Sequence, residues 1–222
     1  MSLEVIEAFN NNAADYEKWY EEPLGRYVLE AELKALAELL PSRGLGIDVG
    51  AGTGIFAKHL TKPERYIICL DPAIEMIKQA KEKELDVIVG IIELAPLRKG
   101  VFDFTYMVAT LEFVRNPLNA LMSIREILKK KRPFVLMIIN RESAWGESYI
   151  NAGKKGHPIF THAKFFTLKE VINYLEKISF KVEKILGTLD NPPIIVPKEK
   201  PKLYAPDKMP SCGVFFIRAT TS

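Results

Sequence analysis

The stretch that decides the fold is GIDVGAGTG, residues 46–54, where an apolar run ends at Asp48 and closely spaced glycines follow. A glycine-rich turn after the first strand of an α/β sheet lies at its carboxyl edge, and glycine lets the backbone approach a ligand closely. A dinucleotide fingerprint has the spacing G-x-G-x-x-G and presents a helix N-terminus to a pyrophosphate. Here the spacing is G-x-G-x-G, and the carboxylate before it would repel a pyrophosphate but suits a cation. The stretch therefore predicts a ligand site, with a nicotinamide site or a plain tight turn as alternatives.

Strand-like and helix-like segments alternate on both sides of this turn. Leucines recur at helical spacing over residues 27–40, and Pro41 ends that helix. Apolar runs such as YIICL at 66–70 and FVLMII at 134–139 are typical of strands buried on both faces of a parallel sheet. The alternation predicts an α/β, doubly wound fold. We expect strands at 44–49, 65–71, 85–90, 102–109 and 134–139, helices at 53–60, 72–83 and 116–131, and then a helix capped by Thr167, a strand, and a last strand at 213–220.

The division of the chain follows from its composition. A chain of 222 residues with 48% hydrophobic residues is long enough for one α/β core. Prolines 192, 193, 197, 201, 206 and 210 make residues 190–210 an extended loop. We expect a single domain over 1–222, with a helical segment at 1–40, a core at 41–186 and 211–222, and a proline-rich insertion at 187–210.

Charge and cysteine content exclude several classes of protein. The net charge of +3 is too small to indicate the excess of basic residues that is typical of nucleic-acid-binding proteins. Cys69 and Cys212 form no disulfide framework, and the start MSLEVIEAFN has neither a signal-peptide pattern nor a membrane-spanning run. We therefore expect a cytoplasmic protein without a membrane or nucleic-acid partner. Gln79 is the single glutamine in a chain with 27% charged residues, which favours a thermophilic source.

A second acidic residue lies about 20 residues after the glycine turn. Asp71 ends the second predicted strand, where either a nicotinamide or an adenosyl cofactor needs a carboxylate for its ribose hydroxyls. Asp71 therefore does not separate the two cofactors. Met76 follows on the next helix, where packing in the core is the alternative to packing on a base.

The run D-V-G-A-G-T-G, residues 48–54, resembles motif I of the class I S-adenosylmethionine-dependent methyltransferases. The resemblance implies a Rossmann-like sheet of seven mostly parallel strands with an antiparallel last strand. It implies that Asp48 reaches towards the ammonium of the cofactor and that the glycines make room for it. The run D-P-A-I-E-M, 71–76, is similar to the family's next motif, in which Met76 packs on the adenine.

The third predicted strand ends in G-I-I-E-L-A-P, residues 90–96, similar to the family's G-D-A-E-x-L-P. Ile91 stands where the family has an aspartate that accepts the amine of the adenine. We therefore expect main-chain groups or water to bind that amine. Ile91 and Ile92 are expected to form the apolar wall of the adenine pocket. The cofactor residues expected from the resemblance are Tyr16, Asp48, Gly50, Ala51, Gly52, Thr53, Gly54, Asp71, Pro72, Met76, Ile91, Ile92, Glu93 and Ala109.

The opening A-A-D-Y-E-K-W-Y, residues 13–20, resembles the N-terminal lid of the ubiquinone and menaquinone C-methyltransferase-like subgroup. Tyr16 would close over the cofactor in that arrangement. The acceptor wall expected from this lid and from the carboxyl edge comprises Trp19, Tyr20, Thr110, Phe113, Arg141, Trp145, Tyr149 and His162.

An acid after the fourth strand, the three histidines and the DNPPI stretch are also considered for a functional role. Glu112 is the ionisable group just past the fourth strand and is a candidate to orient or deprotonate the acceptor, with a solvated loop acid as the alternative. His59, His157 and His162 are scattered, so no metal site is predicted. DNPPI at 190–194 lies beyond the sixth strand and lacks the stacking aromatic of a base-binding motif.

The sequence thus predicts a methyltransferase that uses S-adenosylmethionine, releases S-adenosylhomocysteine and acts on a small, partly apolar molecule by in-line transfer. A nucleic-acid or protein methyltransferase is the first alternative. A nicotinamide-dependent oxidoreductase or a non-catalytic adenosyl-binding regulator is the second. An oligomer is compatible with the sequence.

Overall fold

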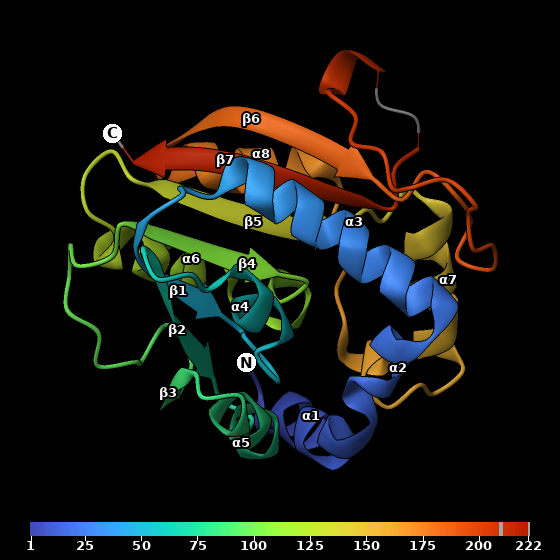
Figure 1. Cartoon of the computed structure of the whole chain (residues 1–222), viewed down its shortest axis with the longest axis horizontal. Coiled ribbons are helices and arrows are strands. Elements are labelled where there is room, and N and C mark those ends of the chain that lie inside the picture. The colour runs from blue at the N-terminus through green and yellow to red at the C-terminus, as the bar shows by residue number, and fades with distance from the viewer. Residues whose placement is uncertain (209–210, 222) are drawn as a thin grey trace.

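The computed structural model describes residues 1–208 and 211–221 and centres on a seven-stranded sheet with the order β3-β2-β1-β4-β5-β7-β6 (Figure 1). Strands β1 to β5 pair in parallel, and β7 runs antiparallel to both β5 and β6. The predicted doubly wound, mostly parallel sheet with an antiparallel last strand is confirmed. Pro210 of the predicted insertion lies outside the described residues. The strands are β1 (Gly44–Val49), β2 (Arg65–Asp71), β3 (Asp86–Val89), β4 (Phe104–Val108), β5 (Pro133–Ile139), β6 (Phe180–Thr188) and β7 (Val214–Thr221).

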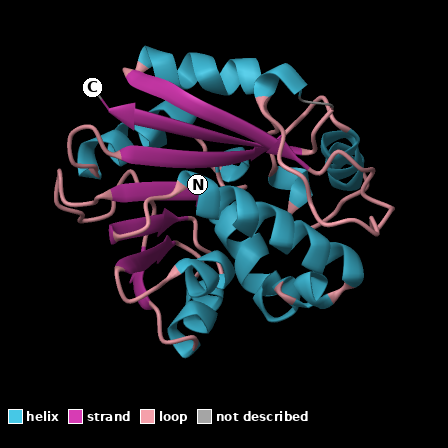
Figure 2. Cartoon of the chain, turned by 45° about the horizontal axis from the view of Figure 1, so that its top comes forward, coloured by secondary structure: helices cyan, strands magenta, loops and turns pink. Residues whose placement is uncertain are grey.

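Helices cover both faces of this sheet (Figure 2). Helices α3 and α4 contribute to the core on one face, and α6 and α8 to the core on the other. The helices are α1 (Leu3–Tyr16), α2 (Lys18–Glu21), α3 (Pro23–Leu39), α4 (Ile55–Leu60), α5 (Ile74–Glu82), α6 (Pro117–Ile127), α7 (Ala144–Lys154) and α8 (Leu168–Lys177), with short 3-10 turns η1 (Leu111–Phe113), η2 (Phe160–His162) and η3 (Pro206–Lys208).

Strand β5 shows why an unbroken apolar run marks the centre of the sheet. Val135 and Met137 belong to the core under α3 and α4, whereas Phe134, Leu136 and Ile138 belong to the core under α6 and α8. Successive side chains of a strand point to opposite faces, so a strand with a core on each side needs apolar residues at every position.

Helix α7 is an element that the sequence analysis missed. It contains Gly146 and Gly153, which weaken a helical pattern. Its start is nevertheless well defined, because the hydroxyl of Ser143 accepts a hydrogen bond of 3.0 Å from the Gly146 N–H. The prediction for α8 is confirmed, since Thr167 caps it in a capping box with Glu170.

The N-terminal helices and the proline-rich loop lie around the carboxyl edge of the sheet. Helix α1 packs against α5, as Figure 1 shows, and leads through α2 into α3. The loop after β6 is extended as predicted, and the indole of Trp145 donates a 2.6 Å hydrogen bond to the carbonyl of Asn191 in it. No helix in residues 1–208 and 211–221 combines the length and apolar character that crossing a membrane requires.

Candidate functional site

A cavity of about 400 Å³ opens at the carboxyl edge of the sheet, beneath the N-terminal helices. Its size lies within the usual range for small-molecule sites. One part of its wall comes from the glycine turn, the ends of β2 and β4 with the residues that follow β4, and helix α5: Gly50, Gly52, Asp71, Met76, Val108, Ala109 and Thr110. The other part is aromatic and comes mainly from α1, α2, α7 and the segment after α7: Phe9, Tyr16, Trp19, Tyr20, Phe113, Trp145, Tyr149 and Phe160.

The glycine turn is built so that its backbone is exposed to the cavity. Gly50, Gly52 and Gly54 have φ of +76°, +55° and +75°, in the left-handed region that favours glycine. A Cβ at Gly50 would meet Thr110 Cγ2 at 2.2 Å, whereas a Cβ at Gly52 would have no atom within 4 Å. The space above Gly52 is therefore open to a ligand, and Gly50 is required by the packing of the turn.

Asp71, at the end of β2, lines the same cavity. Its Oδ2 accepts a hydrogen bond of 2.8 Å from the Gly52 N–H, and its Oδ1 accepts one of 2.8 Å from the Ala73 N–H. Burial raises the pKa of Asp71 to about 6, against the lowering effect of these two donors. These bonds fix the carboxylate beside the glycine turn and leave its remaining lone pairs free for a ligand hydroxyl.

Asp48, which was expected to reach towards the cofactor, is buried behind the cavity wall. It is 1% exposed and does not line the cavity. Burial raises its pKa to about 8, with the Tyr106 hydroxyl acting in the opposite direction and the charge of Asp71 adding to the rise. Its Oδ2 has no hydrogen-bond partner among the described residues. Contact with the cofactor, directly or through water, remains a prediction.

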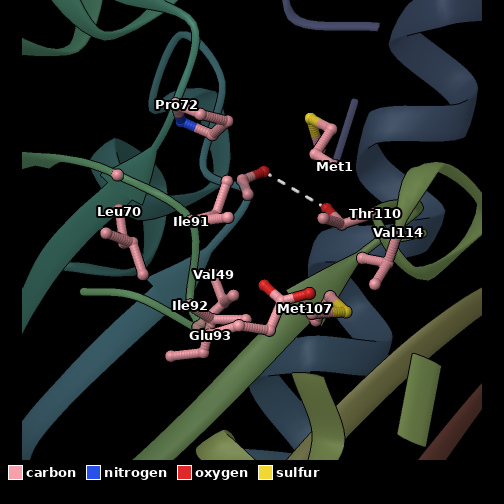
Figure 3. A pocket seen from close by; sticks show the side chains of 12 residues that line it. Met1, Val49, Leu70, Pro72, Ile91, Ile92, Glu93, Met107, Thr110 and Val114 are labelled. Atoms are coloured by element: carbon pink, nitrogen blue, oxygen red, sulfur yellow. Dashed lines mark hydrogen bonds between the residues drawn. The ribbon is translucent and has the colours of Figure 1, made fainter. Parts of the chain in front are cut away.

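A smaller hollow adjoins the cavity on the side of β2 and β3 (Figure 3). Pro72, Ile91, Ile92 and Glu93 line it, together with Leu70 and Met107. Ile91 and Ile92 are the residues that the resemblance predicts beside the adenine, and their apolar character suits the faces of a base. The Ile91 side chain lies beside this hollow in Figure 3, where the family has an acidic group.

The loop after β4 separates the two hollows. Ala109 adopts a φ of +45°, a conformation that is costly for a residue with a Cβ and is concentrated at functional sites. The hydroxyl oxygen of Thr110 lies 2.9 Å from the Val108 carbonyl oxygen and 3.3 Å from the Gly50 carbonyl oxygen, and its single proton is shared between these two acceptors. The bond to Gly50 is drawn in Figure 3. Thr110 therefore lines both hollows, but its hydroxyl is used to hold the glycine turn.

The predicted lid residues lie together on the cavity wall. The ring of Tyr16 is 6.2 Å from that of Tyr20, and the ring of Trp19 is 5.0 Å from Tyr20, centroid to centroid. Met76 lines the cavity and also packs with Ala13 of α1 in a small buried cluster, and its contact with the adenine stays a prediction. Burial raises the pKa of Tyr16 to about 12, and the nearby charge of Glu32 adds to the rise.

Three residues predicted on the acceptor side do not line the cavity. Glu112 is 1% exposed, and its Oε1 accepts a 2.8 Å hydrogen bond from the Ile139 N–H, so it ties η1 to β5. Burial raises its pKa to about 7. It is thus neither a solvated loop acid nor on the wall. Arg141 pairs with Glu170 at 3.1 Å, and His162 lies in η2 away from the wall.

Three residues predicted to bind the cofactor belong to the turn but do not line the cavity: Ala51, Thr53 and Gly54. Gly54 begins α4 as its N-cap, and the carbonyl of Thr53 accepts a 3.0 Å hydrogen bond from Lys83. These contacts support the loop that contains Gly50 and Gly52, and contact of the three residues with the cofactor stays a prediction.

The structure also brings to the wall two residues that were not predicted there. Glu32 reads as one of the charged positions of an amphipathic helix, yet it is 4% exposed and lines the cavity. His157, and not His162, is the histidine on the wall. The position of Glu32 between the buried Ala31 and Ala35 was the available signal, since a charge there breaks the apolar stripe.

Comparison with known proteins is consistent with this geometry. The family model described as a methyltransferase domain matches residues 17–185. A crystal structure from Thermotoga maritima, described as a SAM-dependent methyltransferase and possible histamine N-methyltransferase, is 30% identical, covers 98% of this chain and 100% of its own, and has a TM-score of 0.88.

Two curated relatives extend the comparison. An uncharacterised protein of Methanocaldococcus jannaschii is 32% identical over 83% of this chain and 86% of its own length. A malonyl-[acyl-carrier protein] O-methyltransferase of Geobacter sulfurreducens is 31% identical over 80% of this chain and 70% of its own length. The match to the methyltransferase domain, the seven-stranded fold and the glycine turn agree, and the chain belongs to the class I S-adenosylmethionine-dependent methyltransferases.

Proposed function

We propose that this methyltransferase transfers the methyl group of S-adenosylmethionine to a small, partly apolar acceptor held by the aromatic part of the cavity. The observation that carries the proposal is the continuity of one cavity of about 400 Å³ between the glycine turn and the aromatic wall. A cofactor at the turn would thereby face an acceptor on the opposite wall without water between them.

The residues of the turn fit the cofactor that the family uses. The open space above Gly52 admits a ligand against the backbone, and Asp71 offers a carboxylate for ribose hydroxyls. Pro72, Ile91 and Ile92 would flank the adenine in the adjoining hollow. When bound, the cofactor supplies a methyl group on a sulfonium whose sulfur leaves as a neutral thioether. The protein therefore needs to orient the acceptor and exclude water, which agrees with the absence of a hydrogen-bonded nucleophile and base among the described residues of the wall.

The character of the wall favours a small molecule over a macromolecule. Trp19, Tyr20, Trp145, Tyr149 and Phe160 come from three separate segments and surround the acceptor part of the cavity. Such a wall buries an apolar ligand from several sides, as small-molecule sites do. The solved relative is described as a possible histamine N-methyltransferase, and histamine is a small acceptor. An acceptor of this size suits the cavity.

The test is methyl transfer from S-adenosylmethionine with a labelled methyl group, offered separately to a pool of small metabolites, to RNA and to protein. We expect label in a small product and none in RNA or protein. The Gly52→Ala variant should lose most of this transfer, while Gly100→Ala should retain it, because Gly100 has a similar φ of +62° and lies away from the cavity. Label that accumulates in RNA or protein would contradict the proposal.

A further inference from the structure

Glu32 is a buried acid that the fold does not explain. It lies on α3 within a stripe that includes the buried Val28, Ala31, Ala35 and Leu36, and only 4% of it is exposed. Burying a carboxylate without a partner is costly, because its charge loses the hydration of water. Glu32 has no hydrogen bond or ion pair with any residue in the described ranges 1–208 and 211–221, and burial alone raises its pKa to about 8.

The carboxylate faces the aromatic part of the cavity. Glu32 lines the cavity with Tyr16, Tyr20 and Tyr149. Its charge adds to the effect of burial in raising the pKa of each of these three tyrosines, which come from α1, α2 and α7. Tyrosines from three helices therefore line the same cavity as Glu32, and none of the three donates a hydrogen bond to it in the described structure.

The surrounding rings form a wall that suits a cation. The ring of Tyr149 lies 4.4 Å from Phe160 and 6.2 Å from Trp145, centroid to centroid. Aromatic faces attract ammonium groups through the negative potential of the ring, and the attraction grows when water is excluded. An acid among such rings adds a negative charge at the same place once it gives up its proton to bind an ammonium.

The charges on the wall point the same way. Asp15, Glu32 and Asp71 line the cavity, and within the described chain no lysine or arginine side chain does. Asp15 is exposed and pairs with Lys18, and Asp71 bonds to the glycine turn, so Glu32 is the carboxylate left for the acceptor. An acceptor that carries a carboxylate would meet repulsion here, whereas an amine would be attracted.

We propose that the acceptor is a small apolar amine, and that Glu32 binds its ammonium group beside Tyr149 and takes the proton that must leave before methylation. The proposal rests on the proposed function and names the acceptor class for that cavity. The other titratable groups on residues that line the cavity are the amine of Met1, Asp15, Asp71, His157 and the three tyrosines.

The proton and electron balance of the step is simple. An ammonium has no lone pair, so one N–H proton passes to the Glu32 carboxylate. The freed lone pair forms the N–C bond to the methyl carbon while the C–S bond breaks and its electron pair stays on the sulfur. The products are a methylated ammonium, S-adenosylhomocysteine and a protonated Glu32, which loses its proton to solvent when the next ammonium binds. The raised pKa of Glu32 suits this transfer near neutral pH.

The test uses binding in the presence of S-adenosylhomocysteine, without turnover. The probes are 2-phenylethylamine, tryptamine and hexylamine, with 2-phenylethanol as the neutral counterpart of the first. We expect the wild type to bind at least one amine, to prefer 2-phenylethylamine over the alcohol by at least tenfold, and to lose that preference in Glu32→Gln. Glu30→Gln, on the exposed side of the same helix, should keep it.

A second readout separates direct binding from a structural effect. Calorimetry at pH 7 in two buffers of different ionisation enthalpy measures the protons released on binding. Wild type should release close to one proton with 2-phenylethylamine, because the free Glu32 is mostly protonated at pH 7 and must lose its proton to bind the ammonium. Glu32→Gln should release none. Equal binding of amine and alcohol, no binding of any of the three amines, or unchanged proton release in Glu32→Gln would overturn the amine proposal. Failure to bind S-adenosylhomocysteine would instead overturn the proposed function.

Discussion

Replacing Gly52 by alanine isolates the contact between the glycine turn and the cofactor. Gly52 has a φ of +55°, and Gly100 has one of +62°, and a Cβ at either position would meet no atom within 4 Å. Forcing a left-handed conformation on a residue with a Cβ costs roughly 1–2 kcal/mol. Both alanine variants should therefore lose about the same stability, and the 2.8 Å bond from the residue 52 N–H to Asp71 should remain.

The two variants should differ in cofactor affinity. The new methyl group at residue 52 enters the open part of the cavity, whereas Gly100 does not line it. One methyl group inserted into a packed contact costs about 1–3 kcal/mol, which corresponds to roughly a 5- to 150-fold weaker Kd. Calorimetric titration with S-adenosylhomocysteine and thermal unfolding measure the two effects separately. A Kd for Gly52→Ala within twofold of that for Gly100→Ala would refute the placement of the cofactor against this turn.

Further predictions concern Asp71, Asp48 and thermal stability. Asp71→Ala should weaken S-adenosylhomocysteine binding roughly 10- to 150-fold, since a hydrogen bond to a charged group contributes ~1.5–3 kcal/mol, and an unchanged Kd would remove Asp71 from the site. The pKa of Asp48 is raised from 3.8 to about 8, so the folded state holds its proton more tightly and the free energy of unfolding falls as pH rises through that window. Asp48→Asn removes this loss. The free energy of unfolding of the variant relative to wild type, measured with denaturant, should therefore rise by about 4 kcal/mol between pH 5 and pH 8. The absence of such a rise would contradict a buried carboxyl with a high pKa. The single glutamine and the charge content predict a melting midpoint above about 65 °C, and a midpoint in the mesophilic range of about 45–65 °C would count against a thermophilic source.

The parts of the fold that the sequence predicted are those with strong local signals. Apolar runs such as the one in β5 indicate strands with a core on each face, and Thr167 with Glu170 indicates a capping box. Helix α7 was missed because Gly146 and Gly153 weaken its pattern, and its start depends on the Ser143 cap. Local signals therefore located the sheet better than the segments that cover its edge.

The site divides in the same way. The glycine turn and Asp71 were found because a ligand that approaches the backbone requires glycine and a carboxylate at fixed spacing. Glu112 was misjudged and Glu32 was not singled out, because the burial of an acid depends on distant segments: β5 bonds to Glu112, and α1, α2 and α7 share the cavity wall with Glu32. Sequence spacing does not contain that information.

The most direct test of the central claim is calorimetric titration of the purified protein with S-adenosylhomocysteine, beside NAD and AMP. We predict low-micromolar binding of S-adenosylhomocysteine and much weaker binding of the other two, because the turn around Gly52 lacks the dinucleotide spacing and lies beside the Asp71 carboxylate. Tight binding of NAD without binding of S-adenosylhomocysteine would contradict the account.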